Sequence, residues 1–261
     1  MALKLNGSTD GSVSIDAPAD TSPAGTDVTL TLPTSAGSSG QYLQTNGSGA
    51  LSFAAAGLQS IQAFTTSGSH TWTKPSGINR VKVIVTGAGG GGGGGGNNNN
   101  IGGGGGGGGT AIEIIDVSST SSVSVTVGAG GSGGALATDG TSGGTSSFGT
   151  FCSATGGTFG EHSTGTDESS GRGGVGSNGD LNFRGGYGGA SGAHNSFDEV
   201  GGGHGGASFW GGGGKAGSGW QDVNATAGEA PGSGGGGGMQ GDGSNAGKAG
   251  AAGIVYVEEY A

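Results

Sequence analysis

Hydrophobic and polar residues alternate in eight short runs, which is the pattern of half-buried β-strands. Val81-Lys-Val83 and Val123-Ser-Val-Thr-Val127 alternate strictly, so one face of each run points to a core and the other to water. β-Branched and aromatic residues, which favour strands, dominate all eight. The runs cover residues 61–65, 68–73, 81–86, 110–117, 122–127, 145–148, 150–155 and 254–260. They predict an all-β fold, a small sandwich resembling a jelly roll.

The last run lies about a hundred residues after the one before it. A strand at 254–260 is useful only if it returns to the same sheet, so residues 254–261 are expected to close the sandwich formed by residues 58–155. Residues 156–253 are then an insertion. Structureless loops of that length are uncommon in compact domains. The insertion must therefore have a structure of its own.

Glycine supplies 73 of the 261 residues, and hydrophobic residues only 30%. A conventional core cannot fill this chain, since globular domains are roughly 45–50% apolar. Extended helices of the polyproline-II type have three residues per turn and no internal hydrogen bonds. Their backbone groups can bond neighbouring helices if the side chains are small enough, and buried backbone groups demand such partners. The sequence therefore predicts that the insertion is a stack of polyglycine-II helices.

A second glycine-rich region interrupts the predicted sandwich. Residues 87–109 contain 17 glycines in two arms that flank Asn97 to Asn100 and Ile101. If both arms are extended, this tip stands roughly 25–30 Å from the sandwich. Alternatively the arms are flexible and the tip is slack. Packing of the arms into the larger stack would decide between these possibilities.

Residues 1–57 are rich in Ser, Thr, Gly and Asp, with the alternating run Val28 to Leu32 between Pro23 and Pro33. That alternation suggests a half-buried strand. The region holds too few apolar residues for a core of its own, so identical chains are expected to share the burial. The alternative is a flexible linker.

Between its glycine blocks the insertion carries segments rich in aromatic and other large side chains. Exposed aromatic residues on rigid loops often mediate recognition, but they can also seal the end of a glycine stack. For Trp210 and Trp220 both roles stay open. The candidate contact residues are Asn97, Asn98, Asn99, Asn100, Ile101, Phe159, His162, Phe183, Arg184, His194, Phe197, Phe209, Trp210, Trp220 and Met239.

The formal net charge of −10 argues against nucleic acid or anionic membranes as partners, because both need a basic field. We expect no membrane insertion, since no secretion signal or apolar span is visible. A single cysteine, Cys152, excludes an intrachain disulfide and a cysteine-based zinc site. Phosphate-loop, paired-histidine and nucleophile-elbow motifs are missing too, so neither a cofactor nor an enzymatic activity is expected.

Three features of the sequence resemble known phage proteins. The segments FTTSGSHTWTKPSGINRVKVIVTGAGGGG (64–92), GGTAIEIIDVSSTSSVSVTVGAGG (108–131), SFGTFCSATGG (147–157) and GAAGIVYVEEY (250–260) resemble the glycine-rich domain of bacteriophage tail-fibre proteins. The segment GTDVTLTLPTSAGSSGQYLQTNGSGALSF (25–53) resembles N-terminal segments of fibres from marine phages, notably cyanophages. The alternation of glycine blocks and loops is similar to the tip adhesins of T-even long tail fibres.

The resemblance implies a homotrimeric, receptor-binding tail fibre, made in the host cytoplasm and carried on the virion. Residues 1–57 would trimerise and attach to tail, baseplate or nozzle proteins, and the distal loops would bind a host-surface glycan or outer-membrane protein. Because the chain has its own N-terminal segment, a short fibre attached directly to the virion is favoured over a separate tip subunit. The alternatives are a structural fibre or decoration protein, a polyglycine antifreeze protein and a depolymerase.

Overall fold

The computed structural model describes residues 3–6, 12–15, 29–96, 101–163, 170–191, 201–218, 224–239 and 246–261. The chain divides into two compact units, Met1–Ala56 and Gly57–Ala261. Every regular element of the described residues is a β-strand, which confirms the predicted all-β fold.

The first unit contains two antiparallel strand pairs. β1 (Leu3–Asn6) pairs with β2 (Ser12–Ile15), and β3 (Gln41–Thr45) pairs with β4 (Leu51–Ala55). All five residues of β3 are exposed. Isolated two-stranded hairpins are marginally stable in water, so this unit has little internal stabilisation.

The predicted half-buried strand at Val28 to Leu32 is wrong for its described residues, 29–32. Only Thr31 forms a bridge there, to Ala50, while Leu30 and Leu32 are 58% and 72% exposed. The single bridge follows from the chain's partners, because Thr31 exchanges hydrogen bonds with Gly49 and Leu51 alone. Pro33 lacks the N–H that would extend the pairing.

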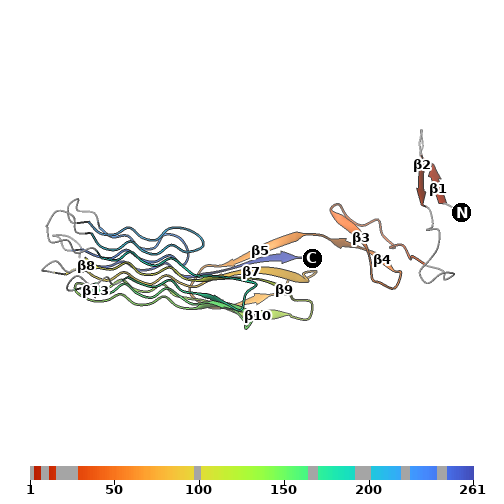
Figure 1. Cartoon of the computed structure of the whole chain (residues 1–261). Coiled ribbons are helices and arrows are strands. Elements are labelled where there is room, and N and C mark those ends of the chain that lie inside the picture. The colour runs from red at the N-terminus through yellow and green to blue at the C-terminus, as the bar shows by residue number, and fades with distance from the viewer. Residues whose placement is uncertain are drawn as a thin grey trace. The chain divides into compact units, whose positions relative to one another are not determined.

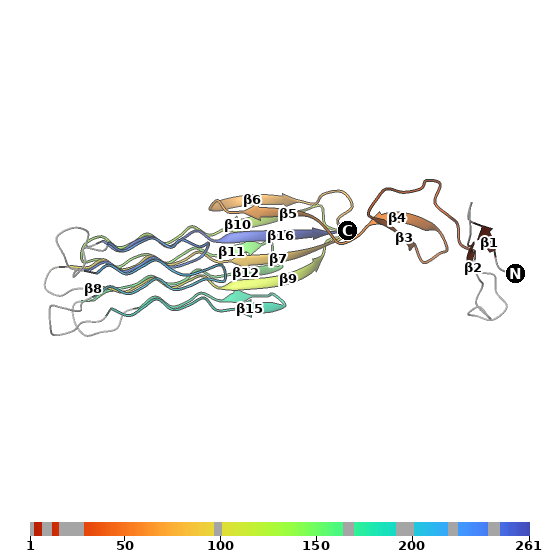
Figure 2. The same cartoon turned by 90° about the horizontal axis from the view of Figure 1, so that it is seen from above.

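The second unit begins with two five-stranded antiparallel sheets (Figures 1 and 2). Their strand orders are β14-β12-β11-β10-β6 and β15-β9-β7-β16-β5. All eight runs predicted from the sequence form strands of these sheets. The strands are β5 (Leu58–Phe64), β6 (Gly68–Thr73), β7 (Arg80–Thr86), β9 (Thr110–Asp116), β10 (Ser122–Val127), β11 (Ser146–Phe148), β12 (Cys152–Ala154), β14 (Gly176–Ser177), β15 (Leu181–Phe183) and β16 (Ile254–Tyr260).

The core between the sheets is formed by the alternate residues that the sequence pattern predicted. β10 is the clearest case, since Val123, Val125 and Val127 are buried and the residues between them are exposed. Trp72 and Phe148, with ring centroids 5.7 Å apart, are the largest fully buried side chains. β16 joins β5 to β7 in the second sheet, so the C-terminal run returns to the sandwich as expected.

A buried carboxyl group connects the edges of the two sheets. Glu259 on β16 is fully buried, and its Oε1 accepts hydrogen bonds from Gln62 Nε2 at 2.6 Å and Trp72 Nε1 at 2.7 Å. The Ser60 hydroxyl donates to its Oε2. Gln62 and Ser60 belong to β5 and Trp72 to β6. Buried polar groups need such partners, so this carboxyl is part of the packing.

Extended segments, which we call rods, run from the sheets to the far end of the unit, where β8 (Ile101–Gly102) pairs with β13 (His162–Ser163) (Figure 1). Their hydrogen-bond partners change with a period of three residues. In rod 87–96, the N–H groups of residues 87, 90 and 93 donate to residues 109, 106 and 103. Those of 88, 91 and 94 donate to residues 144, 141 and 138.

Three inner rods are bonded to one another, and a ring of outer rods surrounds them. The inner rods are residues 87–96, 102–109 and 233–238, and all of their residues are buried. Within the described residues, the outer rods are 128–135, 138–144, 155–161, 170–175, 185–191, 201–207, 211–217, 224–229 and 246–253. We call the whole arrangement the glycine lattice. The two glycine arms of residues 87–109 thus pack inside it, which decides against a free tip on slack arms.

Burial along an outer rod follows the same three-residue period. In rod 128–135, Gly128, Gly131 and Gly134 are buried, whereas Ala129, Ser132 and Ala135 are exposed. Three residues per turn is the repeat of polyproline-II-type helices. The hydrogen bonds and the burial therefore have the period that a polyglycine-II stack requires, and the helical geometry itself stays a prediction.

Candidate binding site

The sequence-predicted contact residues fall into three groups. Asn97 to Asn100, His194, Phe197 and Trp220 lie outside the described residues. The others are either at the far end of the rods, along them, or at the junction of the rods with the second sheet. Only the junction brings several of the predicted residues together.

At the far end, the described candidates are engaged in packing. Ile101 is 1% exposed and pairs with Ser163 across β8 and β13. The Nδ1 of His162 hydrogen-bonds the carbonyl oxygen of Gly94 at 3.1 Å, and its backbone N–H donates to Asp139 Oδ1 at 2.7 Å. Met239 follows an inner rod and is half-buried. These three residues form the base of the far end.

Phe159 lies on the outer rod 155–161 and is half-buried. Its neighbours Thr158 and Glu161 are exposed, as the three-residue period requires. Because Phe159 occupies neither an exposed position of this period nor the junction, the structure does not combine it with the other candidates.

At the junction, four aromatic rings from three segments form a chain over the outer face of the second sheet. Phe183 of β15 and Phe209 have ring centroids 6.1 Å apart, and Phe209 and Trp210 pack edge to face at 5.3 Å. Trp210 in turn lies 5.9 Å from Tyr256 of β16. Sequence analysis missed Tyr256, because its place in a predicted strand indicated only packing.

Trp210 anchors this aromatic chain to the sheet. Its Nε1 donates to Oγ1 of Thr86 at 3.0 Å, and the Thr86 hydroxyl is 2.9 Å from that of Thr110. Both threonines are buried on neighbouring strands. The turn that carries Trp210 is closed by a 2.9 Å hydrogen bond from Ser208 N to Gly211 O. Of the two roles left open for Trp210, the structure shows it in packing.

A cavity of about 250 Å³ opens beside these rings, and we call it the junction pocket. Phe183 and Phe209 line it and are 43% and 49% exposed. Arg184 is the only charged residue of the described lining, and its Nη1 donates to the carbonyl oxygen of Gly173 at 3.0 Å. The lining consists of Gly108, Thr110, Phe183, Arg184, Gly186, Ala207, Ser208 and Phe209. Three predicted candidates thus meet in one concave site.

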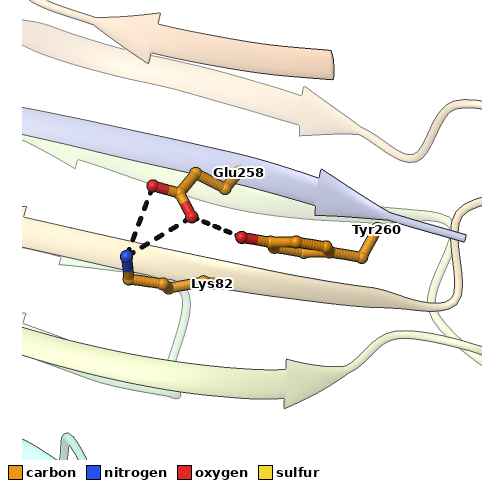
Figure 3. A network of polar contacts seen from close by, with 3 residues as sticks. All are labelled: Lys82, Glu258 and Tyr260. Atoms are coloured by element: carbon orange, nitrogen blue, oxygen red, sulfur yellow. Dashed lines mark hydrogen bonds and ion pairs between the residues drawn. The ribbon is translucent and has the colours of Figure 1, made fainter. Parts of the chain in front are cut away.

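Beyond the junction, the outer face of the second sheet carries a surface polar cluster (Figure 3). Lys82 Nζ lies 3.3 Å from both carboxylate oxygens of Glu258, and the Tyr260 hydroxyl donates to Glu258 Oε2 at 2.6 Å. The hydrogen bond to the carboxylate raises the pKa of the Tyr260 hydroxyl. The cluster links two strands that are already paired, so its role is structural.

The free thiol of Cys152 is buried in the core, and burial next to Glu113 raises its pKa to about 12. Since the thiolate is the nucleophilic form, this side chain is unreactive at neutral pH. We expect native protein at pH 8 to react with 5,5′-dithiobis(2-nitrobenzoate) more than about a hundredfold slower than protein in guanidinium. Equal rates in the two conditions would contradict the buried position.

Glu113 is an acid of β9 whose partial burial makes stability depend on pH. Burial raises its pKa above the ordinary value, a hydrogen bond from Cys152 partly offsets this, and Asp180 raises it further. Among the described residues, its buried Oε2 has no hydrogen-bond partner. A raised pKa in the folded state means that the folded protein binds the proton more tightly than the unfolded chain. The resulting stabilisation is complete below the unfolded pKa and disappears as pH rises through the folded one.

We therefore expect Glu113→Gln to raise the urea midpoint at pH 7.5 relative to wild type, with a smaller difference at pH 4. Asp116→Asn is the matched control of opposite sign, because hydrogen bonds from Ser118 lower the pKa of Asp116. Its stabilising contribution is present above the ordinary pKa of aspartate and is lost as pH falls. Parallel pH profiles for the two variants would contradict this assignment.

Two further searches concern the described residues alone. No helix there is long and apolar enough to cross a membrane. In that same part of the chain, no three His, Cys, Asp or Glu side chains gather closely enough to hold a metal ion.

Comparison with known proteins identifies the second unit. No curated protein sequence matches this chain. A family model described as a glycine-rich domain matches residues 65–260, which include every rod of the lattice and nearly all of both sheets. The match covers far more than half of the 261 residues. The chain therefore belongs to the glycine-rich domain family.

Proposed function

We propose that this protein is a receptor-binding tail-fibre protein that attaches a phage virion to the surface of its host. The observation that carries the proposal is the glycine lattice. Its inner rods bond one another and the outer rods through the backbone, with N···O distances near 2.9 Å, for example from Gly90 to Gly106. A body bonded in several lateral directions is stiff although its side chains are few, and a stiff support suits the display of contact residues.

The far end of the lattice is the predicted contact region. The described residues Ile101, His162 and Met239 lie there or border it, and in sequence they adjoin the predicted contact segments at 97–100 and beyond 239. Their packed positions would hold the neighbouring residues in place. Binding by several copies on one particle would add weak single contacts through effective concentration.

The exposed apolar residues of the first unit support the proposal that copies of the chain associate and attach to the virion through residues 1–57. Leu30, Leu32, Tyr42 and Leu43 are all 45% exposed or more. Apolar residues grouped in a unit with so little core are commonly covered by another chain. Homotrimerisation would supply that cover, and tail, baseplate or nozzle proteins would supply the attachment.

Competition tests the proposed function. Purified full-length protein, added to host cells before the phage, should reduce adsorption to saturation, and immunogold labelling should place the chain on the tail. Labelled particles whose adsorption is unaffected by saturating protein would instead identify a structural fibre or decoration protein.

One face of the lattice favours a second candidate, an ice-binding protein. Small residues occupy exposed positions on neighbouring rods, among them Ala129, Ser132, Ala135, Thr138 and Thr141. Their repeat of three residues places them about 9 Å apart along a rod. Thermal hysteresis of the purified chain separates the candidates, because a receptor-binding fibre should show none.

A further inference from the structure

We propose that the junction pocket binds one negatively charged sugar ring, a hexuronate unit of a surface polysaccharide. This inference rests on the proposed function and names the ligand class for a site on the flank of the lattice, away from its far end. Pockets for small ligands combine apolar walls with a few fixed polar groups. The junction pocket has both.

The two phenylalanines provide the apolar walls. A pyranose ring presents C–H groups on its faces and hydroxyl groups around its rim, so its faces pack on aromatic rings, whose electron-rich surface attracts C–H groups. Phe183 and Phe209 expose nearly half of their area, with ring planes inclined at 37°. Phe209 is held by its edge-to-face contact with Trp210. The walls are therefore fixed before a ligand arrives.

Arg184 provides the charge. A guanidinium group has five N–H donors in a planar fork that fits a carboxylate. Among the described residues, the one hydrogen bond given by this guanidinium is to Gly173 O, and that bond fixes its orientation. None of the described residues that line the pocket is acidic, although the whole chain carries a formal charge of −10. A lone cation in such a lining selects an anion, and the carboxylate of a hexuronate fits it.

The size of the pocket sets the expected affinity. At about 250 Å³ it falls below the usual range of roughly 300–1,000 Å³ for drug-sized ligands. One sugar ring fits, and the rest of a polysaccharide would continue across the surface. Single-site binding should therefore be weak, and several copies of the chain would be needed for firm attachment.

The test is titration of full-length protein with tetragalacturonate and with a mannuronate tetramer, observed by saturation-transfer NMR and calorimetry. Maltotetraose, which has no carboxylate, is the neutral control ligand. We expect at least one uronate to bind at least about tenfold more tightly than maltotetraose. Arg184→Gln should weaken that binding by about tenfold or more, at an unchanged melting temperature, because the side chain is exposed.

Arg172→Gln is the matched control variant, since Arg172 is an exposed arginine on a neighbouring rod and does not line the pocket. It should bind the uronate like wild type. Equal loss in both variants, equal binding by Arg184→Gln and wild type, or no binding of either uronate overturns the proposal.

Adsorption separates this proposal from the proposed function. If Arg184→Gln blocks phage adsorption as well as wild type does, receptor binding stands and the pocket is not its site. If wild type binds uronate but does not block adsorption, the pocket stands and the fibre function fails.

Discussion

Gly105→Ala is expected to lower the free energy of unfolding by about 3 kcal/mol or more. Gly105 lies in the middle of an inner rod. Its N–H donates to Gly235 O at 2.9 Å and its carbonyl oxygen accepts from Gly206 at 2.8 Å. A Cβ at this position would lie 2.1 Å from the carbonyl oxygen of Gly90, which belongs to another inner rod. Because that obstacle is backbone on a buried rod, it cannot move aside without breaking further hydrogen bonds.

Gly212→Ala is the matched control, because Gly212 is exposed on an outer rod and a Cβ added there would meet no atom within 4 Å. Alanine at this position should leave stability unchanged or raise it by up to about 1 kcal/mol, since it restricts the unfolded chain. Urea unfolding followed by circular dichroism measures both variants. A loss of similar size in the two would show that the lattice does not depend on close backbone contact.

Glu259→Met is expected to cost about 3 kcal/mol of stability, a fall in melting temperature of roughly 6–12 °C. Methionine has a similar length but accepts no strong hydrogen bond. The substitution would leave the Trp72 indole N–H unpaired in the core and remove the acceptor of Gln62 and Ser60. An unpaired buried donor costs the free energy of its lost hydration. Scanning calorimetry gives the shift.

Glu258→Met on the same strand is the control for this variant. Glu258 faces outward and pairs with Lys82 at 3.3 Å, where the side chain of Lys82 is 35% exposed. Ion pairs of this kind contribute about 1 kcal/mol or less. Equal destabilisation by the two substitutions would mean that the buried network of Glu259 adds nothing beyond an ordinary surface contact.

The strands of the second unit could be predicted because their pattern is local. In β10, alternate valines bury one face whatever the strand's partner is, so the run at 122–127 was found with its bounds. The run at 28–32 has the same pattern, yet Leu30 and Leu32 are exposed. Alternation shows that a segment can form half of a sheet, but the other half must come from elsewhere in the fold, and Thr31 has a single bridge.

The candidate site could be predicted only in part. Phe183, Arg184 and Phe209 were chosen because large side chains are rare in the insertion, and the structure unites them at one pocket. Ile101 was chosen as the end of the predicted tip between the glycine arms, and it is buried. The sequence does contain the signal that distinguishes inner from outer rods. Inner rods are nearly uninterrupted glycine, whereas rod 185–191 has Tyr187 and Ala190 three residues apart at its exposed positions.

By itself, the sequence determined that this protein is all-β, that its apolar residues suffice only for a small sandwich and that its glycine must be stabilised by backbone hydrogen bonds. These conclusions follow from alternation and composition, which are properties of the chain alone. Only the tertiary structure decided which rods lie inside, since a glycine rod carries no side chain to specify its neighbour. The choice depends on the closure of every buried N–H and C=O across distant segments, as at Gly105 between Gly235 and Gly206.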